Sequence, residues 1–373
     1  MIKKKVLIIF GTRPEVIKLA PVVIELRKDP NIEVLLCNTE QQKELSNQTL
    51  KFFNLKSDFN LDVMRPNQSL SLAQVNIQDK LSKLFEDNNF DATIVQGDTL
   101  TAFCGALVAF YNKLPIFHIE AGLRSYNLNE PYPEEALRQM LSRITYLHFA
   151  PSQRAHDYLV KENISNDRIF ITGNTVIDAL SCISQDSLDS ATKFLTSLGI
   201  SKDQKLILVT AHRRENHGER LDSIISAIKE LSNKYKDYNF VIPIHPNPNV
   251  KEKIINALKV QSNAVLTSPL DYPGLVTIMK RSSLILTDSG GIQEEAPTFN
   301  VPILVLRYET ERPEGIEKGF AKLVGANKDK IVEEASLVLD GKSNLGKVNL
   351  KNPYGSGDAA IKIHKCIKDF LNI

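Results

Sequence analysis

The chain has 373 residues, of which 42% are hydrophobic and 24% are charged. This is the composition of an ordinary globular protein, and the length favours two domains over one or four. The formal net charge is only +2, which gives no bulk electrostatic reason for binding nucleic acid or an anionic membrane. Any site for an anion must therefore be built locally.

The cysteines and the first residues indicate a soluble protein of a reducing compartment. Four cysteines are spread along the chain, at Cys37, Cys104, Cys182 and Cys366. None forms a Cys-x-x-Cys pair, which disfavours a disulfide framework or a zinc site. The segment MIKKKVLIIF starts with basic residues, but its apolar run is too short for a signal peptide, and no later run approaches the ~20 residues of a membrane span. We expect a cytoplasmic protein with no metal, no nucleic-acid partner and no membrane contact.

Short apolar or β-branched runs alternate with helical patterns along the chain. In the first half, the runs predict strands at 6–10, 33–37, 92–96 and 115–119. The helical patterns there lie at 14–28, 68–87, 99–112 and 152–162. After a polar stretch with a weak helix at 189–198, further strands are predicted at 206–210, 240–244, 264–268, 284–288 and 302–306.

This alternation predicts an α/β fold with two Rossmann-like, doubly wound parallel-sheet domains. The expected N-terminal domain spans 1–168 and is joined by a C-terminal helix within 357–373, and the second domain spans 169–356. Ligands of such sheets bind beyond the carboxyl ends of the strands. The loops at these ends, facing a central cleft between the domains, are therefore the expected site.

The stretch FGTRPEVIKLAP follows the first predicted strand. Gly11 allows a tight turn, and Pro14 and Glu15 suit the first turn of a helix. A helix start alone explains these residues. Arg13 and Lys18 add two cations beside free backbone N–H groups, and this combination favours binding of a phosphate group.

Carboxylates occupy three loops of the first half. Asp98 and Glu120 follow apolar strands closely, and Glu134 and Glu135 stand at the start of a helix. Three acidic loops at one edge of a sheet favour acid/base chemistry. Asp98 could instead cap the next helix, and the two glutamates could complement a helix dipole. We favour chemistry for Asp98 and Glu120 and a structural role for Glu135.

Cations gather in the corresponding loops of the second half. His212 follows the strand at 206–210, with Arg213 and Arg214 beside it. We expect His212 to contact a diphosphate, because the arginines could pair with neighbouring glutamates. His245 and Arg312 follow later strands at the same edge.

The stretch LTDSGGIQEEAPTF is the second candidate for an anion site. Gly290 and Gly291 would let backbone N–H groups approach a diphosphate, with Ser289 beside them, and Glu295 could accept hydrogen bonds from a ribose. A serine-capped helix is the structural alternative. The chain has no G-x-G-x-x-G after its first strand and no Walker A sequence, which disfavours a nicotinamide enzyme and a P-loop ATPase.

Taken together, these loops resemble the non-hydrolysing UDP-N-acetylglucosamine 2-epimerases. The resemblance rests on an ordered set of stretches between residues 11 and 357: GTRPEVIKLAP, QGDT, HIEAGLRS, PYPEEALR, AHRREN, HPNPNV, DSGGIQEEAP, ERPEG and NPYGSG. It implies a fold similar to B-type glycosyltransferases and a homodimer that needs no cofactor. The implied reaction converts UDP-GlcNAc to UDP-ManNAc, eliminating UDP to leave 2-acetamidoglucal and adding it back with the proton on the other face. The product would supply a surface polysaccharide such as a capsule.

The matching motifs imply roles for individual residues. Asp98, Glu120 and Glu134 would form the acid/base group, with the acid and the base not assigned, and His212 would hold the leaving diphosphate. Substrate binding is assigned to a larger set: Arg13, Lys18, Arg138, Leu270, Leu275, Ser289, Gly290, Gly291, Glu295 and Arg312.

Two of these substrate-binding residues are assigned to the base of the nucleotide. Leu270 and Leu275, expected in the loop before a helix at 275–280, match positions that face the uracil.

Other readings stay open. Hydrolysing relatives, which release free ManNAc and UDP, usually read Gly-Thr-Arg-Ala-Asp where this chain has Gly-Thr-Arg-Pro-Glu. An epimerase of another UDP-2-acetamido sugar would carry the same loops. A glycosyltransferase of the same fold is disfavoured by the three acids, and a catalytically silent sugar-nucleotide sensor by the intact set of acids with His212.

The chain departs from the family where a second, activating UDP-GlcNAc binds in relatives. The stretch TEQQ has Gln42 where many bacterial members have a histidine, and Asn67 replaces an arginine. Gln41, Gln42 and His245 would belong to this allosteric site. The loop RYET at 307–310 also differs from the commoner Arg-Asp-Thr-Thr.

We predict that activation by substrate is weakened or rebuilt here, because Gln42 and Asn67 replace the usual imidazole and guanidinium. The initial rate should rise hyperbolically with UDP-GlcNAc, and the reverse reaction should run without added UDP-GlcNAc. Steady-state kinetics in both directions measure this. A sigmoidal curve, with reverse turnover that needs UDP-GlcNAc, would contradict the prediction.

Overall fold

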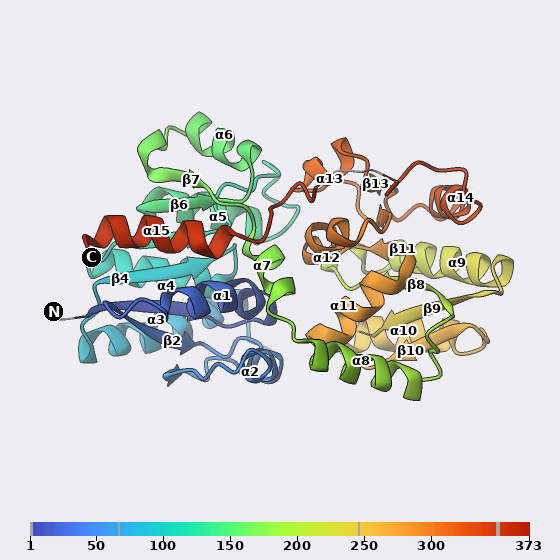
Figure 1. Ribbon diagram of the computed structural model, residues 1–373, viewed down its shortest axis with the longest axis horizontal. Coiled ribbons are helices and arrows are strands. Elements are labelled where there is room, and N and C mark those ends of the chain that lie inside the picture. The colour runs from blue at the N-terminus through green and yellow to red at the C-terminus, as the bar shows by residue number, and fades with distance from the viewer. Residues whose placement is uncertain (1–2, 66–67, 245–246, 348–350) are drawn as a thin grey trace. The chain divides into compact units, whose positions relative to one another are not determined.

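The computed structural model describes residues 3–65, 68–244, 247–347 and 351–373 (Figure 1). The chain divides into two compact units, which we call unit 1 (Met1–Cys182 with Tyr354–Ile373) and unit 2 (Ile183–Pro353). The domain boundary expected at 168/169 stays a prediction. In the structure, the elements between residues 169 and 182 lie with unit 1.

Unit 1 contains one parallel sheet, in the order β3-β2-β1-β4-β5-β6-β7 over its described residues. The strands are β1 (Lys4–Phe10), β2 (Ile32–Asn38), β3 (Phe59–Asn60), β4 (Ala92–Gln96), β5 (Ile116–Ile119), β6 (Leu147–Ala150) and β7 (Ile169–Ile171). The helices are α1 (Arg13–Leu26), α2 (Lys43–Phe52), α3 (Leu70–Asp87), α4 (Leu100–Tyr111), α5 (Glu134–Ile144), α6 (Gln153–Lys161), η1 (Asn166–Arg168), α7 (Thr175–Ser181) and α15 (Ala359–Leu371).

Unit 2 repeats this architecture with a parallel sheet in the order β10-β9-β8-β11-β12-β13 over its described residues. The strands are β8 (Lys205–Thr210), β9 (Tyr238–Pro243), β10 (Ala264–Thr267), β11 (Ser282–Thr287), β12 (Ile303–Val305) and β13 (Ala321–Leu323). The helices are α8 (Gln185–Ser197), η2 (Arg214–Asn216), α9 (Glu219–Lys234), α10 (Pro248–Leu258), α11 (Tyr272–Arg281), α12 (Gly290–Glu295), η3 (Ala296–Phe299), α13 (Pro313–Glu317) and α14 (Lys328–Leu339). The predicted fold class, two doubly wound parallel-sheet units, is confirmed.

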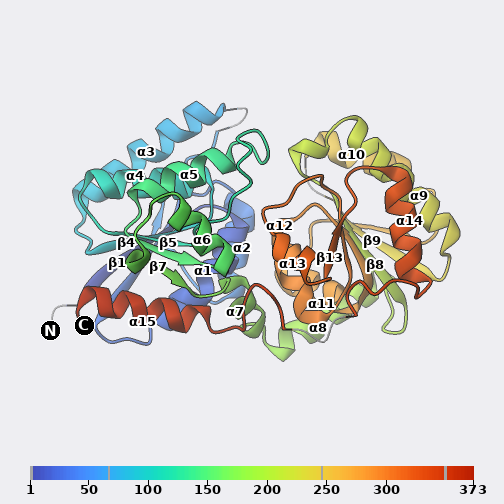
Figure 2. The ribbon, with the colours of Figure 1, turned by 90° about the horizontal axis from the view of Figure 1, so that it is seen from above.

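Helices cover both faces of each sheet. Figure 2 shows α3, α4 and α5 on one face of the unit 1 sheet and α1 and α15 on the other. On the first face, Leu7, Ile9 and Val95 of the sheet pack with Ile77 and Leu81 of α3, all fully buried. None of the helices in the described part of the chain is both long and apolar enough to cross a membrane.

The C-terminal helix α15 is an integral part of unit 1. It packs against α1 and α7. The buried carboxylate of Asp178 accepts the backbone N–H of Ala360 at its first turn (2.9 Å). Near its end, Lys368 lies 3.0 Å from the carboxylate of Asp29, which follows α1. The C-terminal helix therefore belongs to unit 1.

The strand order determines which loops lie beside the point where the winding of each sheet reverses. In both sheets the chain winds outward in one direction, returns to the middle strand and then winds the other way. The reversal falls between β1 and β4 in unit 1 and between β8 and β11 in unit 2. Loops at the carboxyl ends of strands that flank such a switch point are the usual ligand sites of these folds.

Two histidines lie inside the unit 1 sheet. His118 of β5 and His148 of β6 are register partners and are 1% and 0% exposed. Burial lowers the pKa of His118 to about 4 and that of His148 to about 3. Both rings are therefore neutral near pH 7, because the sheet interior disfavours the imidazolium form.

We predict that acid removes the stabilisation that His148 provides. The unfolded chain binds a proton at this histidine below its ordinary pKa of about 6.5, whereas the folded chain does so only near pH 3. The contribution is thus complete above pH 6.5 and is lost as the pH falls towards 3. The stability advantage of the wild type over His148→Gln, measured by urea unfolding, should shrink by about 2 kcal/mol between pH 7.5 and pH 5. An advantage that does not change with pH would refute this.

Candidate active site

Glu120 is held at the end of β5 in an uncommon backbone conformation. Its φ of 64° lies in the left-handed region, which non-glycine residues occupy mainly where the surrounding structure compensates the strain. The side chain is 4% exposed, and the Lys18 ammonium lies 2.5 Å from its Oε2. The Gln96 amide donates a hydrogen bond to the same oxygen. The carboxylate is thus kept inside the protein by a cation from α1 and a donor from β4.

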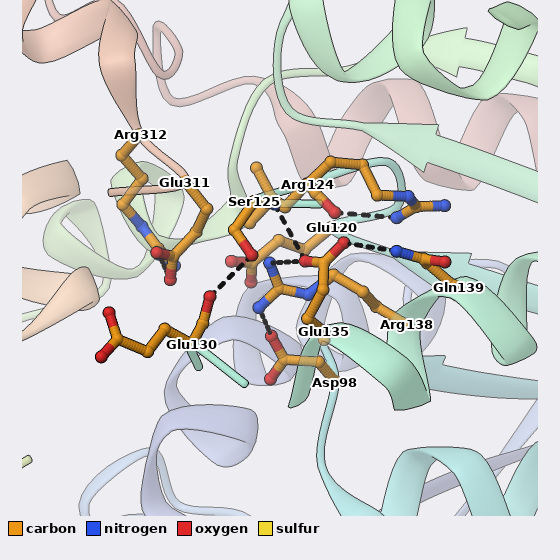
Figure 3. Close-up of polar contacts among 12 residues, drawn as sticks. Asp98, Glu120, Arg124, Ser125, Glu130, Glu135, Arg138, Gln139, Glu311 and Arg312 are labelled. Atoms are coloured by element: carbon orange, nitrogen blue, oxygen red, sulfur yellow. Dashed lines mark hydrogen bonds and ion pairs between the residues drawn. The ribbon is translucent and has the colours of Figure 1, made fainter. Parts of the chain in front are cut away.

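Asp98 follows β4, the strand next to β5, and is paired with an arginine. The Arg138 guanidinium of α5 forms an ion pair with its Oδ2. Arg138 is 3% exposed and also lies 3.3 Å from Oε2 of Glu135 (Figure 3). The alternative role of Asp98 as a helix cap is not realised, because the hydroxyl of Thr99 caps α4 by accepting the Ala102 N–H (3.0 Å).

Glu135 is the buried anchor of this region. Its two carboxylate oxygens accept the backbone N–H groups of Ser125 (2.9 Å) and Tyr126 (3.2 Å) and the side-chain amide of Gln139 (2.8 Å) (Figure 3). It thereby fixes the loop after β5 as well as Arg138. Glu134, its neighbour, is the first residue of α5 and is half-buried.

A neutral histidine, His118 of β5, contacts the loop that carries Asp98. Nε2 of His118 lies 2.7 Å from the carbonyl oxygen of Gly97, the residue before Asp98. Because the pKa of His118 is lowered to about 4, the ring is uncharged and can donate one proton to this carbonyl. Gly97 has a φ of 72°, so this turn needs the glycine.

The loop after β1 is packed tightly against its neighbours. A Cβ atom on Gly11 would lie 2.0 Å from Oγ1 of Thr39, so only glycine fits. The side chain of Gln42 accepts the backbone N–H of Arg13 (3.1 Å), and that of Gln41 accepts the hydroxyl of Thr101 (2.9 Å). Arg13 is the first residue of α1 and is half-buried.

The two glutamines of the expected allosteric site thus lie beside the loop that carries Arg13. The other residues named for that site, His245 and Asn67, lie outside the described residues.

In unit 2, Asp288 organises the loop that carries His212. It is fully buried at the end of β11, and its Oδ2 accepts the backbone N–H groups of His212 and Arg213 (2.9 Å each) and the amide of Asn216 (3.0 Å). Nδ1 of His212 lies 3.4 Å from Oδ1. Desolvation lowers the pKa of His212, and the Asp288 carboxylate acts in the opposite direction.

Arg312 lies on the glycine turn after β11. Its guanidinium is paired with the buried carboxylates of Glu294 (2.5 Å) and Glu311. A Cβ atom on Gly290 would lie 2.6 Å from Cζ of Arg312, whereas one on Gly291 would meet only Oε1 of Glu295, at 3.5 Å. Gly290 therefore has no side chain because Arg312 occupies that space, whereas a Cβ atom on Gly291 would make only an ordinary contact.

The remaining predicted residues of unit 2 flank this turn. Ser289 occupies the N-cap position of α12, but its hydroxyl makes no capping hydrogen bond. Glu295, at the end of α12, is 5% exposed. Glu215, one of the glutamates near His212, pairs with Arg307 (2.7 Å).

One predicted position needs correction. Leu275 lies inside α11 rather than in the loop before it, because Asp271 caps the helix by accepting the Gly274 N–H (2.9 Å) and so starts it at Tyr272. Leu270 precedes this cap and is 5% exposed.

Several supporting residues were not predicted from the sequence. Gln96 and Asp288 are polar residues that directly end or follow buried strands, and this position is the signal that identifies them. Glu294 carries no such signal, because its partner Arg312 lies 18 positions away. Glu311 is adjacent to Arg312, but neither residue directly ends or follows a buried strand. Within the described residues, no group of three or more His, Cys, Asp and Glu side chains is placed to hold a metal.

Comparison with known proteins identifies the family. Residues 24–368 match the family model described as UDP-N-acetylglucosamine 2-epimerase. The chain is 46% identical to the UDP-N-acetylglucosamine 2-epimerase of Neisseria meningitidis serogroup A over 361 residues, which cover 95% of this chain and 97% of that protein. The chain therefore belongs to the UDP-N-acetylglucosamine 2-epimerase family.

Solved structures agree with this assignment. The crystal structure of the UDP-GlcNAc 2-epimerase from Neisseria meningitidis bound to UDP-GlcNAc matches with a TM-score of 0.92 at 44% identity, covering 98% of this chain and 100% of that one. The enzyme of Methanocaldococcus jannaschii in complex with UDP-GlcNAc and UDP matches with a TM-score of 0.88 at 33% identity, covering 99% and 100%.

We predict that Lys18 and Glu120 are coupled in stability. Lys18→Met removes the ammonium and leaves a buried carboxylate without its cation, which should cost about 3 kcal/mol of unfolding free energy. The double variant Lys18→Met/Glu120→Gln should recover at least half of this loss, since Gln96 can still hydrogen-bond a neutral amide. Urea unfolding at pH 7.5 measures both.

The control is Lys83→Met, which breaks the exposed contact between Lys83 and Asp79 and should change little. A double variant that is less stable than Lys18→Met alone would show that the two side chains are not coupled in this way.

Proposed function

We propose that this chain is a non-hydrolysing UDP-GlcNAc 2-epimerase that interconverts UDP-GlcNAc and UDP-ManNAc. The observation that carries the proposal is the arrangement of Asp98 and Glu120 at the ends of adjacent strands, each with its own buried cation. Because nearly the whole chain belongs to the UDP-N-acetylglucosamine 2-epimerase family, we take UDP-GlcNAc as the substrate on which these two acids act. The relatives whose structures contain UDP-GlcNAc support the same substrate here.

The chemistry explains why several acids are needed. The C2 hydrogen of the sugar has no adjacent carbonyl group, so simple deprotonation gives no stabilised carbanion. A base instead removes the C2 proton while the C1–O bond to the diphosphate breaks, and the electrons form the C1–C2 double bond of 2-acetamidoglucal. In the return step the diphosphate oxygen bonds to C1, and an acid delivers a proton to the opposite face of C2. Water must be excluded, because it would trap the intermediate.

We assign the proton transfers to unit 1 and the nucleotide to unit 2. Asp98, Glu120 and Glu134 form the acid/base group, with Arg138 supporting Asp98. Ser289, Gly290, Gly291 and Arg312 hold the diphosphate with His212, Glu295 binds the ribose, and Leu270 and Leu275 contact the uracil. Arg13 and Lys18 add positive charge that favours the departing diphosphate. Stabilisation of the transition state by preorganised charges of this kind is usually the largest single contribution to an enzyme's rate enhancement.

The hydrolysing alternative releases free ManNAc and UDP. The Pro14-Glu15 pair, where hydrolysing relatives usually have Ala-Asp, favours the non-hydrolysing reaction. An epimerase of another UDP-2-acetamido sugar is the second alternative, and it would share every residue discussed above.

We also propose that the enzyme is a cytoplasmic homodimer that supplies ManNAc for a surface polysaccharide. Exposed apolar side chains on neighbouring helices of unit 1 support self-association: Leu72 and Val75 on α3, and Phe110 and Tyr111 on α4. Sedimentation equilibrium at the monomer mass would exclude the dimer.

We predict that incubation with UDP-GlcNAc in heavy water yields UDP-ManNAc with deuterium at C2 and the same label in recovered UDP-GlcNAc. Proton NMR follows both sugars in one sample. Glu120→Gln should slow the exchange by ~10²–10⁴-fold, because it removes a group that transfers a proton. Asp91→Asn, which changes a carboxylate at the amino end of β4, is the matched control and should exchange normally.

Each other result points to another function. Free ManNAc in place of UDP-ManNAc would establish hydrolysis. If the wild type incorporates no deuterium at C2, the remaining candidate functions are a glycosyltransferase and a sugar-nucleotide sensor.

A further inference from the structure

The first two turns of α1 carry two buried charged residues three positions apart. Glu15 and Lys18 therefore lie on the same side of the helix. Lys18 contacts Glu120, as described above. Glu15 is 1% exposed, and its contacts exceed those that a helix start requires.

The two oxygens of Glu15 do different things. Oε2 accepts the backbone N–H groups of Gly11 (3.0 Å) and Thr12 (2.8 Å) and the hydroxyl of Thr12 (2.7 Å). These bonds close the turn between β1 and α1, as a glutamate at this position of a capping box does. Oε1 reaches across the switch point of the sheet and accepts the hydroxyl of Thr99 (2.7 Å).

Thr99 connects this contact to the acid. It directly follows Asp98, and its Oγ1 also accepts the Ala102 N–H at the start of α4 (3.0 Å). The Thr99 hydroxyl thus donates a hydrogen bond to the Glu15 carboxylate and accepts one from the first turn of α4. Through the peptide bond, Thr99 is also tied to Asp98, which carries the proposed catalytic carboxylate. A shift of Glu15 would move the Asp98 backbone with it.

We infer that Glu15 is a positioning residue for the reaction, and that it holds the Asp98 loop through Thr99 while Lys18, three residues further along α1, holds Glu120. One helical turn then sets both acids relative to each other. The inference rests on the proposed function, because it takes Asp98 and Glu120 as proton-transfer groups. Errors of about 1 Å in such geometry can cost ~10²-fold in rate.

The cost of keeping Glu15 at this position supports a role beyond capping. Burial raises the pKa of its carboxyl to about 7, although the bonds from Thr99, Thr12 and Gly11 act in the opposite direction. An exposed capping glutamate would close the same turn without this desolvation.

Two sets of variants test the inference. Thr99→Val removes the hydroxyl, and Thr99→Ser restores it. Glu15→Gln keeps the shape but replaces one oxygen with an amide that donates instead of accepting. We expect Thr99→Val and Glu15→Gln each to lower kcat at least ~10-fold, with KM for UDP-GlcNAc changed less than ~3-fold, because the acids and not the nucleotide are displaced. Thr99→Ser should return kcat to within about 3-fold of the wild type.

The pair should also behave as one unit. The double variant Glu15→Gln/Thr99→Val should lose no more activity than the worse single variant. Two matched controls separate positioning from folding. Asp178→Asn alters another buried carboxylate that caps a helix in unit 1, and Ser184→Ala removes only the N-cap of α8. Both should leave kcat unchanged.

Three results would overturn the inference: wild-type kcat in Glu15→Gln and Thr99→Val, additive losses in the double variant, or equal losses in the controls. A wild type that does not convert UDP-GlcNAc would instead refute the proposed function. In that case crystal structures of the wild type and Glu15→Gln still decide, since the inference predicts a displaced loop at 97–99 and unshifted loops would contradict it.

Discussion

The constraint on which the site depends is that charges buried in the protein must be paired. A buried charge without a partner is strongly destabilising, and in unit 1 the buried cations Lys18 and Arg138 are paired with carboxylates brought by other elements. Lys18 of α1 serves Glu120, and Arg138 of α5 serves Asp98. The positions of α1 and α5 against the sheet therefore fix the acids. The fold accomplishes this at the switch point between β1 and β4, where loops from both directions of winding meet.

Unit 2 uses the same fold with the charges exchanged. There the buried carboxylates serve the groups that we assign to the nucleotide: Asp288 shapes the His212 loop, and Glu294 and Glu311 hold the Arg312 guanidinium against Gly290. The result is a set of oriented donors and a cation at the carboxyl edge of the second sheet. Two copies of one architecture thus carry the paired acids in one unit and, in the other, the groups that we assign to the nucleotide.

Much of this could be predicted from the sequence, because long apolar runs mark buried central strands. The sequence pattern predicts β1, β4, β5, β8 and β11 and the loops after them, and with these loops Asp98, Glu120 and His212. The short strands β3, β6, β7 and β13 were not predicted. They have two to four residues, and β6 includes a buried histidine, so they lack the apolar run on which such a prediction depends. The partner of Lys18 was missed for another reason: its contact with Glu120 joins residues 102 positions apart, and tertiary structure alone brings them together. Leu275 was placed outside its helix because the cap formed by Asp271 was not recognised.

The central claim is that unit 1 transfers protons and unit 2 binds the nucleotide. Calorimetric titration of UDP into the triple variant Asp98→Asn/Glu120→Gln/Glu134→Gln tests it most directly. The account predicts UDP affinity equal to that of the wild type or tighter, since three negative charges are removed and the groups of unit 2 are untouched. A loss of affinity of more than ~10-fold, equivalent to ~1.4 kcal/mol, would contradict it.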